Sequence, residues 1–384
     1  MAALLPDSLQ TAPPAAANFP AVINLASGYG NFATPAVAAE RAIAAIQADR
    51  LLQGPVEGLL ALREAIGVNF HRQNAPQVTP VHIMITPGVK AALFALLKTI
   101  LRPGDEVLVP TPNWFGFGEL ITQAGGIIRP LPLAPSDGYA LPPEALEAAI
   151  TPRTRVFLFS NPNNPTGRIY QHDEIEALLT VTRRHPGLFV LSDEIYNLIN
   201  FSSAPVPCLL AFPDPHGQHL VVNGFSKSLA LIGWGVGYLV APPAVVQAAA
   251  GGQFATGAAV PVPNQHAALA ATEHSAAIAK ELLVQLAPTR ALLLEALSAL
   301  SGVRFVEPEG TYYVFADLRH FLPPTQLPAE ASAALVAKLR TGGVDVVDGA
   351  TCDAPGFVRI SYALPEPELR EALRRLQVVL LEQK

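Results

Sequence analysis

Short apolar runs alternate with helix-patterned segments between residues 81 and 242. The runs are rich in β-branched and aromatic residues, and the segments after Gly88, Pro143 and Asp173 carry apolar residues at helical spacing. This alternation is typical of parallel strands joined by helices. It predicts an α/β fold whose large domain holds a seven-stranded, mostly parallel sheet flanked by helices. The predicted strands are 81–86, 106–109, 127–131, 156–160, 189–193, 219–223 and 236–240.

The pattern changes in the last third of the chain. Residues 264–299 are predicted to form one long helical region, with a kink at Pro288. Four short strands are then expected at 304–306, 312–317, 345–347 and 358–362, and a separate helix is expected near the start of the chain at 35–49. We therefore predict an N-terminal arm (1–20), a large cofactor-binding domain (50–285) and a small α+β domain formed by both chain ends (21–49 plus 286–384).

Composition narrows the class of protein. The 384 residues carry a net charge of −6, so the basic surface of a nucleic-acid-binding protein is not expected. Cys208 and Cys352 are far apart and have no partners at metal-ligand spacing, so neither a disulfide framework nor a metal site is predicted. The N-terminus lacks a basic segment before an apolar run, and no uncharged apolar stretch is long enough for a membrane span. These features predict a cytoplasmic protein.

Three polar motifs follow successive predicted strands. Asn164 lies in Ser-Asn-Pro-Asn-Asn-Pro-Thr-Gly (160–167), Asp193 and Tyr196 lie in Ser-Asp-Glu-Ile-Tyr (192–196), and Lys227 lies in a glycine-rich segment (223–238). A pyridoxal phosphate enzyme needs a lysine for a Schiff base and a carboxylate that keeps the pyridine nitrogen protonated. Taken singly, Lys227 could be a surface lysine and 160–167 a plain turn. Their order favours the cofactor site, because each gap between Asn164, Asp193 and Lys227 fits one βα unit.

This order resembles that of the class I/II aminotransferases, which are fold-type I pyridoxal phosphate enzymes. Further stretches that match the family are 85–93, 110–114, 310–315 and 358–362, so the resemblance covers nearly the whole chain. It implies that Lys227 forms the Schiff base and moves the proton, and that Asp193 pairs with the pyridinium nitrogen. It also implies that Asn164 and Tyr196 donate to the ring oxygen, which makes Lys227, Asp193 and Tyr196 the catalytic set.

The resemblance assigns the remaining contacts of the site. Arg359 would bind the α-carboxylate of the substrate as a bidentate fork, the alternative being a structural salt bridge. Gly28 would let the chain approach the substrate, and Asn164 would contact it as well. The cofactor-binding residues would also include the ring-stacking Trp114, Ser226 beside the lysine, and the phosphate loop at a helix start formed by Gly88, Val89 and Lys90.

Three positions depart from the family pattern. Gly235 stands where the family carries the arginine that binds the cofactor's phosphate, and Gln53 stands where it carries a tyrosine that reaches the neighbouring subunit's phosphate. Residues 29–31, Tyr-Gly-Asn, replace the usual Pro-Asp in the loop over the substrate. Two explanations remain open: another group compensates, or the site is remodelled for a different reaction. The candidates for compensation are Ser226, Thr256, Lys90 and Gln53.

The leading functional hypothesis is a pyridoxal 5'-phosphate-dependent aminotransferase that moves an amino group between an amino acid and a 2-oxo acid by a ping-pong mechanism. The alternatives are a lyase or an oxidase on the same scaffold, or a non-catalytic ligand-binding relative. The resemblance further implies a homodimer with shared active sites, across which the arm packs. Four aromatic residues suggest an apolar substrate pocket, although each could equally belong to the core: Phe19, Tyr29, Phe117 and Tyr312.

Overall fold

The structure is a computed structural model that describes residues 21–48, 54–257, 259–323 and 325–381. The predicted arm and Gln53 lie outside the described residues. In the described part, a seven-stranded sheet forms as predicted. Its first strand begins two residues later than expected, because Pro80–His82 forms a 3-10 turn. The strands are β2 (Ile83–Thr86), β3 (Glu106–Thr111), β4 (Ile127–Pro132), β5 (Thr154–Ser160), β6 (Phe189–Asp193), β7 (His219–Gly224) and β8 (Gly237–Val240).

The sheet has the order β2-β8-β7-β6-β5-β3-β4. Strands β3 to β7 pair in parallel, whereas β8 is antiparallel to both of its neighbours, β2 and β7. The chain between β7 and β8 contains no helix, and only an antiparallel neighbour can be reached without a long crossover. The sheet is therefore mostly parallel, with one reversed strand.

Alternation along the strands divides the core into two layers. Ile83 and Ile85 pack in one hydrophobic cluster, while Met84 between them packs in another. The same two-residue period separates Phe157 and Phe159 from Leu158. Because both faces of each strand are apolar, the sheet is buried on both sides, as parallel sheets are.

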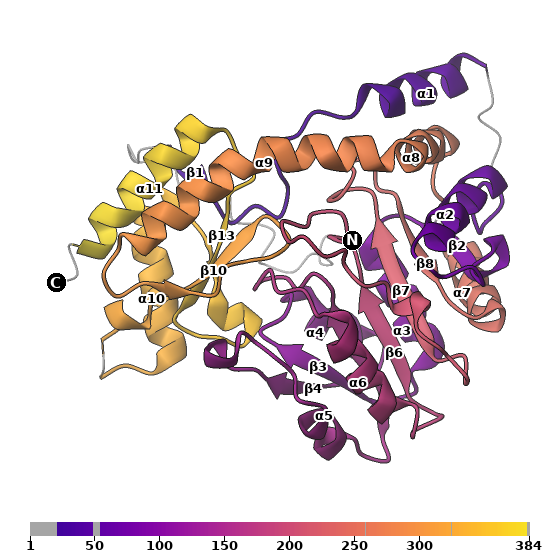
Figure 1. Cartoon of the computed structure of the whole chain (residues 1–384), viewed down its shortest axis with the longest axis horizontal. Helices are drawn as coiled ribbons and strands as arrows, with labels where there is room; N and C mark the ends of the chain where they lie inside the picture. The colour runs from indigo at the N-terminus through magenta and orange to yellow at the C-terminus, as the bar shows by residue number, and fades with distance from the viewer. Residues whose placement is uncertain (1–20, 49–53, 258, 324, 382–384) are drawn as a thin grey trace, which may run out of the picture.

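Helices supply the other half of each layer. The first cluster includes residues of α2 (Leu60–Arg72), α5 (Pro143–Ala149) and α6 (His172–Thr182). The second includes residues of α3 (Val89–Ile100), α4 (Gly116–Gln123) and α7 (Pro243–Thr256). Figure 1 shows these helices around the strands. The predicted helix starts after Gly88, at Pro143 and near Asp173 are confirmed.

The C-terminal third forms two small sheets. In one of them, β1 (Ile23–Asn24) pairs in parallel with β11 (Val344–Asp345), so the two ends of the chain meet there. The other has the order β12-β13-β10-β9. The single strand expected at 345–347 is therefore two strands, because the chain changes partners between Asp345 and Val347. The members of the second sheet are β9 (Arg304–Phe305), β10 (Tyr313–Asp317), β12 (Val347–Asp348) and β13 (Phe357–Ser361).

The helical region expected at 264–299 is two helices. The chain breaks at His274, whose φ of −109° and ψ of 16° leave the helical region, and the second helix continues through Pro288. The break at His274 was not predicted, and the kink at Pro288 stays a prediction. The two helices are α8 (Val262–Glu273) and α9 (Ser275–Ser298).

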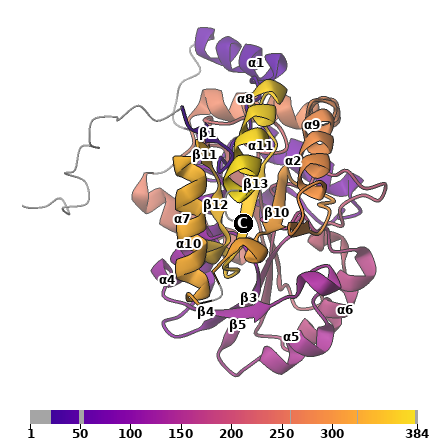
Figure 2. The same cartoon turned by 90° about the vertical axis from the view of Figure 1, so that its left-hand side faces the viewer.

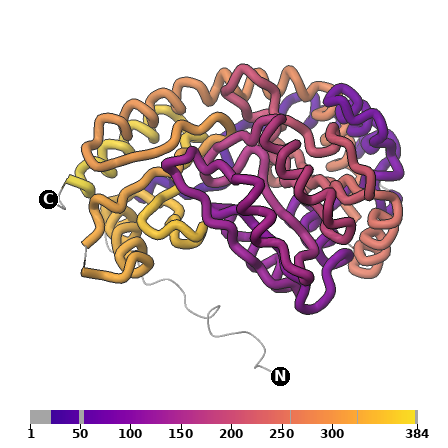
Figure 3. Tube along the Cα trace, turned by 60° about the horizontal axis from the view of Figure 1, so that its bottom comes forward, coloured from indigo at the N-terminus to yellow at the C-terminus, as the bar shows by residue number. Residues whose placement is uncertain are grey.

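Helix α1 (Ala36–Gln47) packs against α8, above the rest of the molecule in Figure 2. Helices α10 (Pro328–Thr341) and α11 (Glu366–Leu381) complete the C-terminal part, which lies at one end of the molecule in Figure 3. The exact division into domains at residues 49, 50, 285 and 286 stays a prediction. Among the described residues, no helix is long and apolar enough to cross a membrane.

Candidate active site

Strand register brings the three predicted motifs to one edge of the sheet. Ser160 at the end of β5 pairs with Asp193 at the end of β6, and Asp193 pairs with Val222 near the end of β7. Asn164 follows the first of these strands and Lys227 follows the third. The carboxyl edge of a parallel sheet is where such folds present their ligand-binding groups.

Glycines bring a helix start to the same edge. Gly237 of β8 pairs with both Thr86 and Gly224. A Cβ atom at Gly237 would lie 2.5 Å from the carbonyl carbon of Gly88, and one at Gly224 would lie 2.6 Å from a methyl group of Val89. Gly88 itself has a φ of +88° and caps α3. Only glycine permits this close approach, which places the exposed N–H groups of the first turn of α3 beside the segment that carries Lys227.

Lys227 points its amine toward the N-terminal segment. Its Nζ donates to the carbonyl oxygen of Gly28 at 2.5 Å and lies 4.0 Å from the ring centroid of Tyr29. Burial, together with the positive charges of Arg359 and Lys90, lowers the pKa of Lys227 to about 7, while Asp193 opposes this shift. The amine is thus partly neutral near pH 7, as a nucleophile and base must be.

Asp193 is buried at the end of β6. One of its carboxylate oxygens accepts the backbone N–H of Ile195 at 3.2 Å. Burial raises the pKa of Asp193 to about 7, although the Ile195 N–H and the charge of Lys227 favour the ionised form. A carboxylate held in such a place gains a strong partner from any buried cation that binds beside it.

Tyrosine hydroxyls connect the large sheet to the C-terminal sheet. The hydroxyl of Tyr196 shares a hydrogen bond of 2.8 Å with that of Tyr313. Tyr312 and Tyr313 both donate to the carbonyl oxygen of Gly28, at 2.9 and 3.2 Å. Burial holds the pKa of Tyr196 well above its ordinary value, so this hydroxyl stays protonated and able to donate. A Cβ at Gly28 would meet only ordinary contact distances, so the close approach expected there stays a prediction about bound substrate.

Arg359 is 3% exposed on β13. Its guanidinium donates to the side-chain oxygen of Asn164 at 3.0 Å and to the carbonyl oxygen of Ala26 at 2.9 Å. Its Nε is buried without a hydrogen-bond partner, and among the described residues no carboxylate forms an ion pair with Arg359. The structural salt bridge that was the alternative for Arg359 is therefore not formed within the described chain. The bond to Asn164 occupies that residue's carbonyl and leaves its NH₂ group as the donor.

The remaining predicted cofactor contacts lie in less buried positions. Lys90 is exposed, with its Nζ 5.4 Å from the ring centroid of Trp114, and Ser226 is half-buried next to Lys227. Gly235 is exposed, and a Cβ there would meet no atom within 4 Å. Thr256 donates its hydroxyl to carbonyl groups of its own helix, so it is a poor candidate for compensation.

Two side chains of the site were missed by the sequence reasoning. Tyr313 lies 4.2 Å from the guanidinium carbon of Arg359, measured to the ring centroid, and Phe115 lies 5.9 Å from it. The ring of Phe115 is 48% exposed. The doubled tyrosine at 312 and 313 was a signal for the first, whereas nothing in the sequence distinguishes Phe115 from a core residue.

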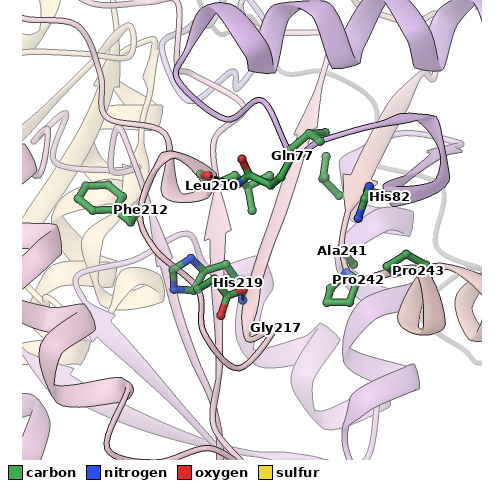
Figure 4. A pocket seen from close by; sticks show the side chains of 12 residues that line it. Gln77, His82, Leu210, Phe212, Gly217, His219, Ala241, Pro242 and Pro243 are labelled. Carbon is green, nitrogen blue, oxygen red and sulfur yellow. Dashed lines mark hydrogen bonds between the residues drawn. The ribbon is translucent and has the colours of Figure 1, made fainter.

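A cavity of about 250 Å³ lies at the opposite edge of the sheet (Figure 4). It contains His219 at the start of β7, whereas Lys227 follows the end of that strand. Gln77, His82 and Pro242 also line it. None of the described residues that line it belongs to the predicted site.

Known proteins resemble this chain over nearly its whole length. The family model for aminotransferase class I and II matches residues 20–376. The aspartate/prephenate aminotransferase of Thermus thermophilus is 35% identical over 362 residues, which cover 94% of this chain and 91% of that protein. The aspartate aminotransferase of Streptomyces avermitilis is 33% identical over a match that covers 94% of this chain and 90% of that protein.

Solved structures show the same fold. That of the Thermus thermophilus aspartate aminotransferase with maleate has a TM-score of 0.86 and 36% identity, and covers 94% of this chain and 92% of that one. The aspartate aminotransferase from Rhizobium meliloti has a TM-score of 0.86 and 31% identity, and the match covers 94% of this chain and 91% of that one. This chain belongs to the class I and II aminotransferases.

Proposed function

We propose that this aminotransferase uses pyridoxal 5'-phosphate as its cofactor and binds it at the carboxyl edge of the large sheet. The donor set fits the group. Lys227 offers an amine whose pKa is lowered to about 7, Asp193 offers a buried carboxylate, and the start of α3 offers free N–H groups. Bound there, pyridoxal phosphate would supply an aldehyde that reacts with amines and a protonated ring that withdraws electrons from the substrate Cα.

Lys227 performs two tasks in this proposal. Its neutral amine would hold the cofactor through the aldehyde, and the same Nζ, when free, would move the proton at the substrate Cα. Both tasks need the unprotonated form, which burial and the positive charges of Arg359 and Lys90 favour. The carbonyl oxygen of Gly28 holds this Nζ in the site.

Asp193, Tyr196 and Asn164 position and polarise the ring. Ionised Asp193 would hold the pyridine nitrogen in its protonated form, because a buried carboxylate stabilises a neighbouring cation. The hydroxyl of Tyr196 and the NH₂ group of Asn164 would donate to the ring oxygen. Trp114 would hold the ring by stacking, and Gly88, Val89, Lys90 and Ser226 would hold the phosphate.

Arg359 binds the α-carboxylate of the substrate. Its guanidinium is oriented by Asn164 and Ala26, yet it has no carboxylate partner among the described residues. A buried cation of this kind is stabilised by an anion that arrives with the substrate. The unpaired Arg359 beside the partly neutral Lys227 is the observation that carries the proposal.

We propose aspartate as the amino donor, because the relatives are named aspartate or aspartate/prephenate aminotransferases. For the acceptor we propose a ring-bearing 2-oxo acid of the prephenate type. The exposed rings of Tyr29 and Phe115 support it, since they flank Lys227 and Arg359 respectively. Amino donor and acceptor would exchange by a ping-pong sequence.

The proposed assembly is a homodimer in the cytoplasm. The ring of Phe254 is 74% exposed beside a cavity of about 350 Å³, which is also lined by Gly54 and Val56. An exposed large apolar group next to a cavity favours burial against another copy. Light scattering of the purified protein tests the dimer, and cell fractionation tests the location.

The test of function combines the pure protein with pyridoxal phosphate, aspartate and prephenate. We expect loss of the visible absorbance on adding aspartate alone, its return on adding the oxo acid, and parallel lines in double-reciprocal plots. Steady release of ammonia without an acceptor would instead indicate the lyase or oxidase alternative. Absence of any cofactor absorbance would contradict the proposal itself.

A further inference from the structure

Lys90 is a cation at a helix N-terminus, where cations are usually unfavourable. It lies in the first turn of α3, where the aligned peptide dipoles favour anions over cations. The first turn contains no acidic residue, and Gly88 provides no side-chain cap. Among the described residues, no carboxylate forms an ion pair with Lys90. A cation placed here is unfavourable unless an anion binds, and such breaks of a local rule occur at functional sites.

The surroundings of Lys90 belong to the active site. Its Nζ lies 5.4 Å from the ring centroid of Trp114, and its positive charge contributes to lowering the pKa of Lys227. Gly237 brings the start of α3 against β8, close to the segment that holds Ser226. Positive charge therefore gathers from three sources at this end of the site: Lys90, Lys227 and the helix N-terminus.

Gly235 provides no side chain at the same end of the site, where the family carries an arginine. It lies two residues before Gly237, which pairs with both Thr86 and Gly224 at this edge of the sheet. Its φ is +63°, it is exposed, and a Cβ there would meet no atom within 4 Å. There is room for a long side chain at residue 235, but the chain places none there.

We propose that Lys90, together with the first turn of α3, provides the counter-charge for the cofactor's phosphate in place of the arginine that the family carries where this chain has Gly235. The inference rests on the proposed function, because it assumes pyridoxal phosphate at this site. Lys90 would then be the residue that makes the protein bind the phosphorylated cofactor more tightly than its phosphate-free form.

The experiment measures the Kd of pyridoxal phosphate and of pyridoxal by equilibrium dialysis against the full-length apoprotein. Pyridoxal has the same aldehyde and ring but no phosphate, so the ratio of the two constants isolates the phosphate end. The variants are Lys90→Met and Lys90→Arg, and Gly235→Arg with Gly235→Met as its uncharged match. The Gly235 pair carries the same backbone strain, which therefore cancels.

We expect Lys90→Met to raise the Kd of pyridoxal phosphate roughly 10- to 100-fold, as loss of a charge-assisted contact does, and to change that of pyridoxal less than about threefold. Lys90→Arg should stay within about threefold for both. Gly235→Arg should tighten pyridoxal phosphate about tenfold and restore it in Lys90→Met, whereas Gly235→Met should do neither.

Equal weakening of both ligands by Lys90→Met would overturn the inference, and so would a Kd that does not change. If wild-type protein bound neither ligand, the proposed function would fail instead, so the two failures are distinct. Thermal unfolding of the apoproteins checks the fold. Should Lys90→Met not fold, the Gly235 pair alone decides: equal constants for Gly235→Arg and Gly235→Met would overturn the inference.

Discussion

The two ends of the active site differ in how firmly the protein holds them. At the carboxylate end, Arg359 and Tyr196 are buried, and their polar groups bond to Asn164, Ala26 and Tyr313. At the phosphate end, Lys90 and Gly235 are exposed and Ser226 is half-buried. The first end is built from two strands of one sheet, β10 and β13, and from the loops that follow β1, β5 and β6, whereas the second is built from one helix start and a loop.

This difference indicates which end of the site orients the substrate and which end sets the affinity for the cofactor. Buried, mutually bonded groups have fixed positions before any ligand arrives, so they can orient the substrate at little further entropic cost. Exposed groups are ordered by the ligand they bind, so they mainly set how tightly it is held. We therefore expect changes at the carboxylate end to alter catalysis and changes at the phosphate end to alter cofactor affinity.

The largest effect is expected at Lys227, which lies between the two ends. Lys227→Met keeps the length of the side chain but removes both the nucleophile and the base, so kcat for transamination should fall roughly 10⁴-fold or more. Stopped-flow measurement of the half-reaction with aspartate tests this. Lys98→Met, an exposed position on α3, is the control and should retain activity. Full activity in Lys227→Met would refute the assignment.

The next effect concerns the firm end. Arg359→Lys keeps the charge but loses the planar fork, so kcat/KM for aspartate should fall roughly 10- to 100-fold. The Kd of pyridoxal phosphate should change little, because the cofactor's phosphate lies at the other end. Arg370→Lys, at an exposed ion pair on α11, is the matched control. An equal loss of cofactor affinity in Arg359→Lys would break the distinction between the two ends.

Burial of Lys227 also predicts how the stability of the apoprotein depends on pH. Its folded-state pKa is about 7 against an ordinary 10.5, so the unfolded chain binds more protons between these values. The Lys227 contribution to the free energy of unfolding therefore rises with pH across this window. Lys227→Met should be more stable than wild type by about 4 kcal/mol near pH 7, with the gain vanishing toward pH 10.5. Urea unfolding measures it, and a gain that grows with pH would contradict the prediction.

The smallest effect is expected from the tyrosine hydroxyls. Tyr313→Phe removes one hydrogen bond to Tyr196 and one to Gly28, while Tyr312 still donates to Gly28. We expect kcat to fall about two- to tenfold, the usual worth of one such bond. Tyr139→Phe is the control, because the buried hydroxyl of Tyr139 has no hydrogen-bond partner among the described residues. A loss above 100-fold would mean that Tyr313 takes part in the chemistry itself.

Much of the fold was predictable because the signals are local. Short apolar runs rich in β-branched and aromatic residues, alternating with helix-patterned segments, predicted all seven strands of the large sheet. The reversed direction of β8, the break at His274 and the split of the strand at 345–347 were not predictable in this way. Each depends on which partner a segment meets in space, and local propensity does not encode the partner.

The same division holds for the active site. The sequence alone was enough to identify Lys227, Asp193 and Asn164 as candidates, because each lies in a motif with a definite position relative to a strand. The resemblance to a known family added Arg359. Only the tertiary structure joined Lys227 to Gly28, which is 199 residues away in the chain, and placed Phe115 beside Arg359. It also showed that, within the part of the chain that the structure describes, Lys90 has no acidic partner at its helix start. Burial, unpaired charge and lowered pKa are properties of surroundings assembled from distant segments, so they appear only when the chain is folded.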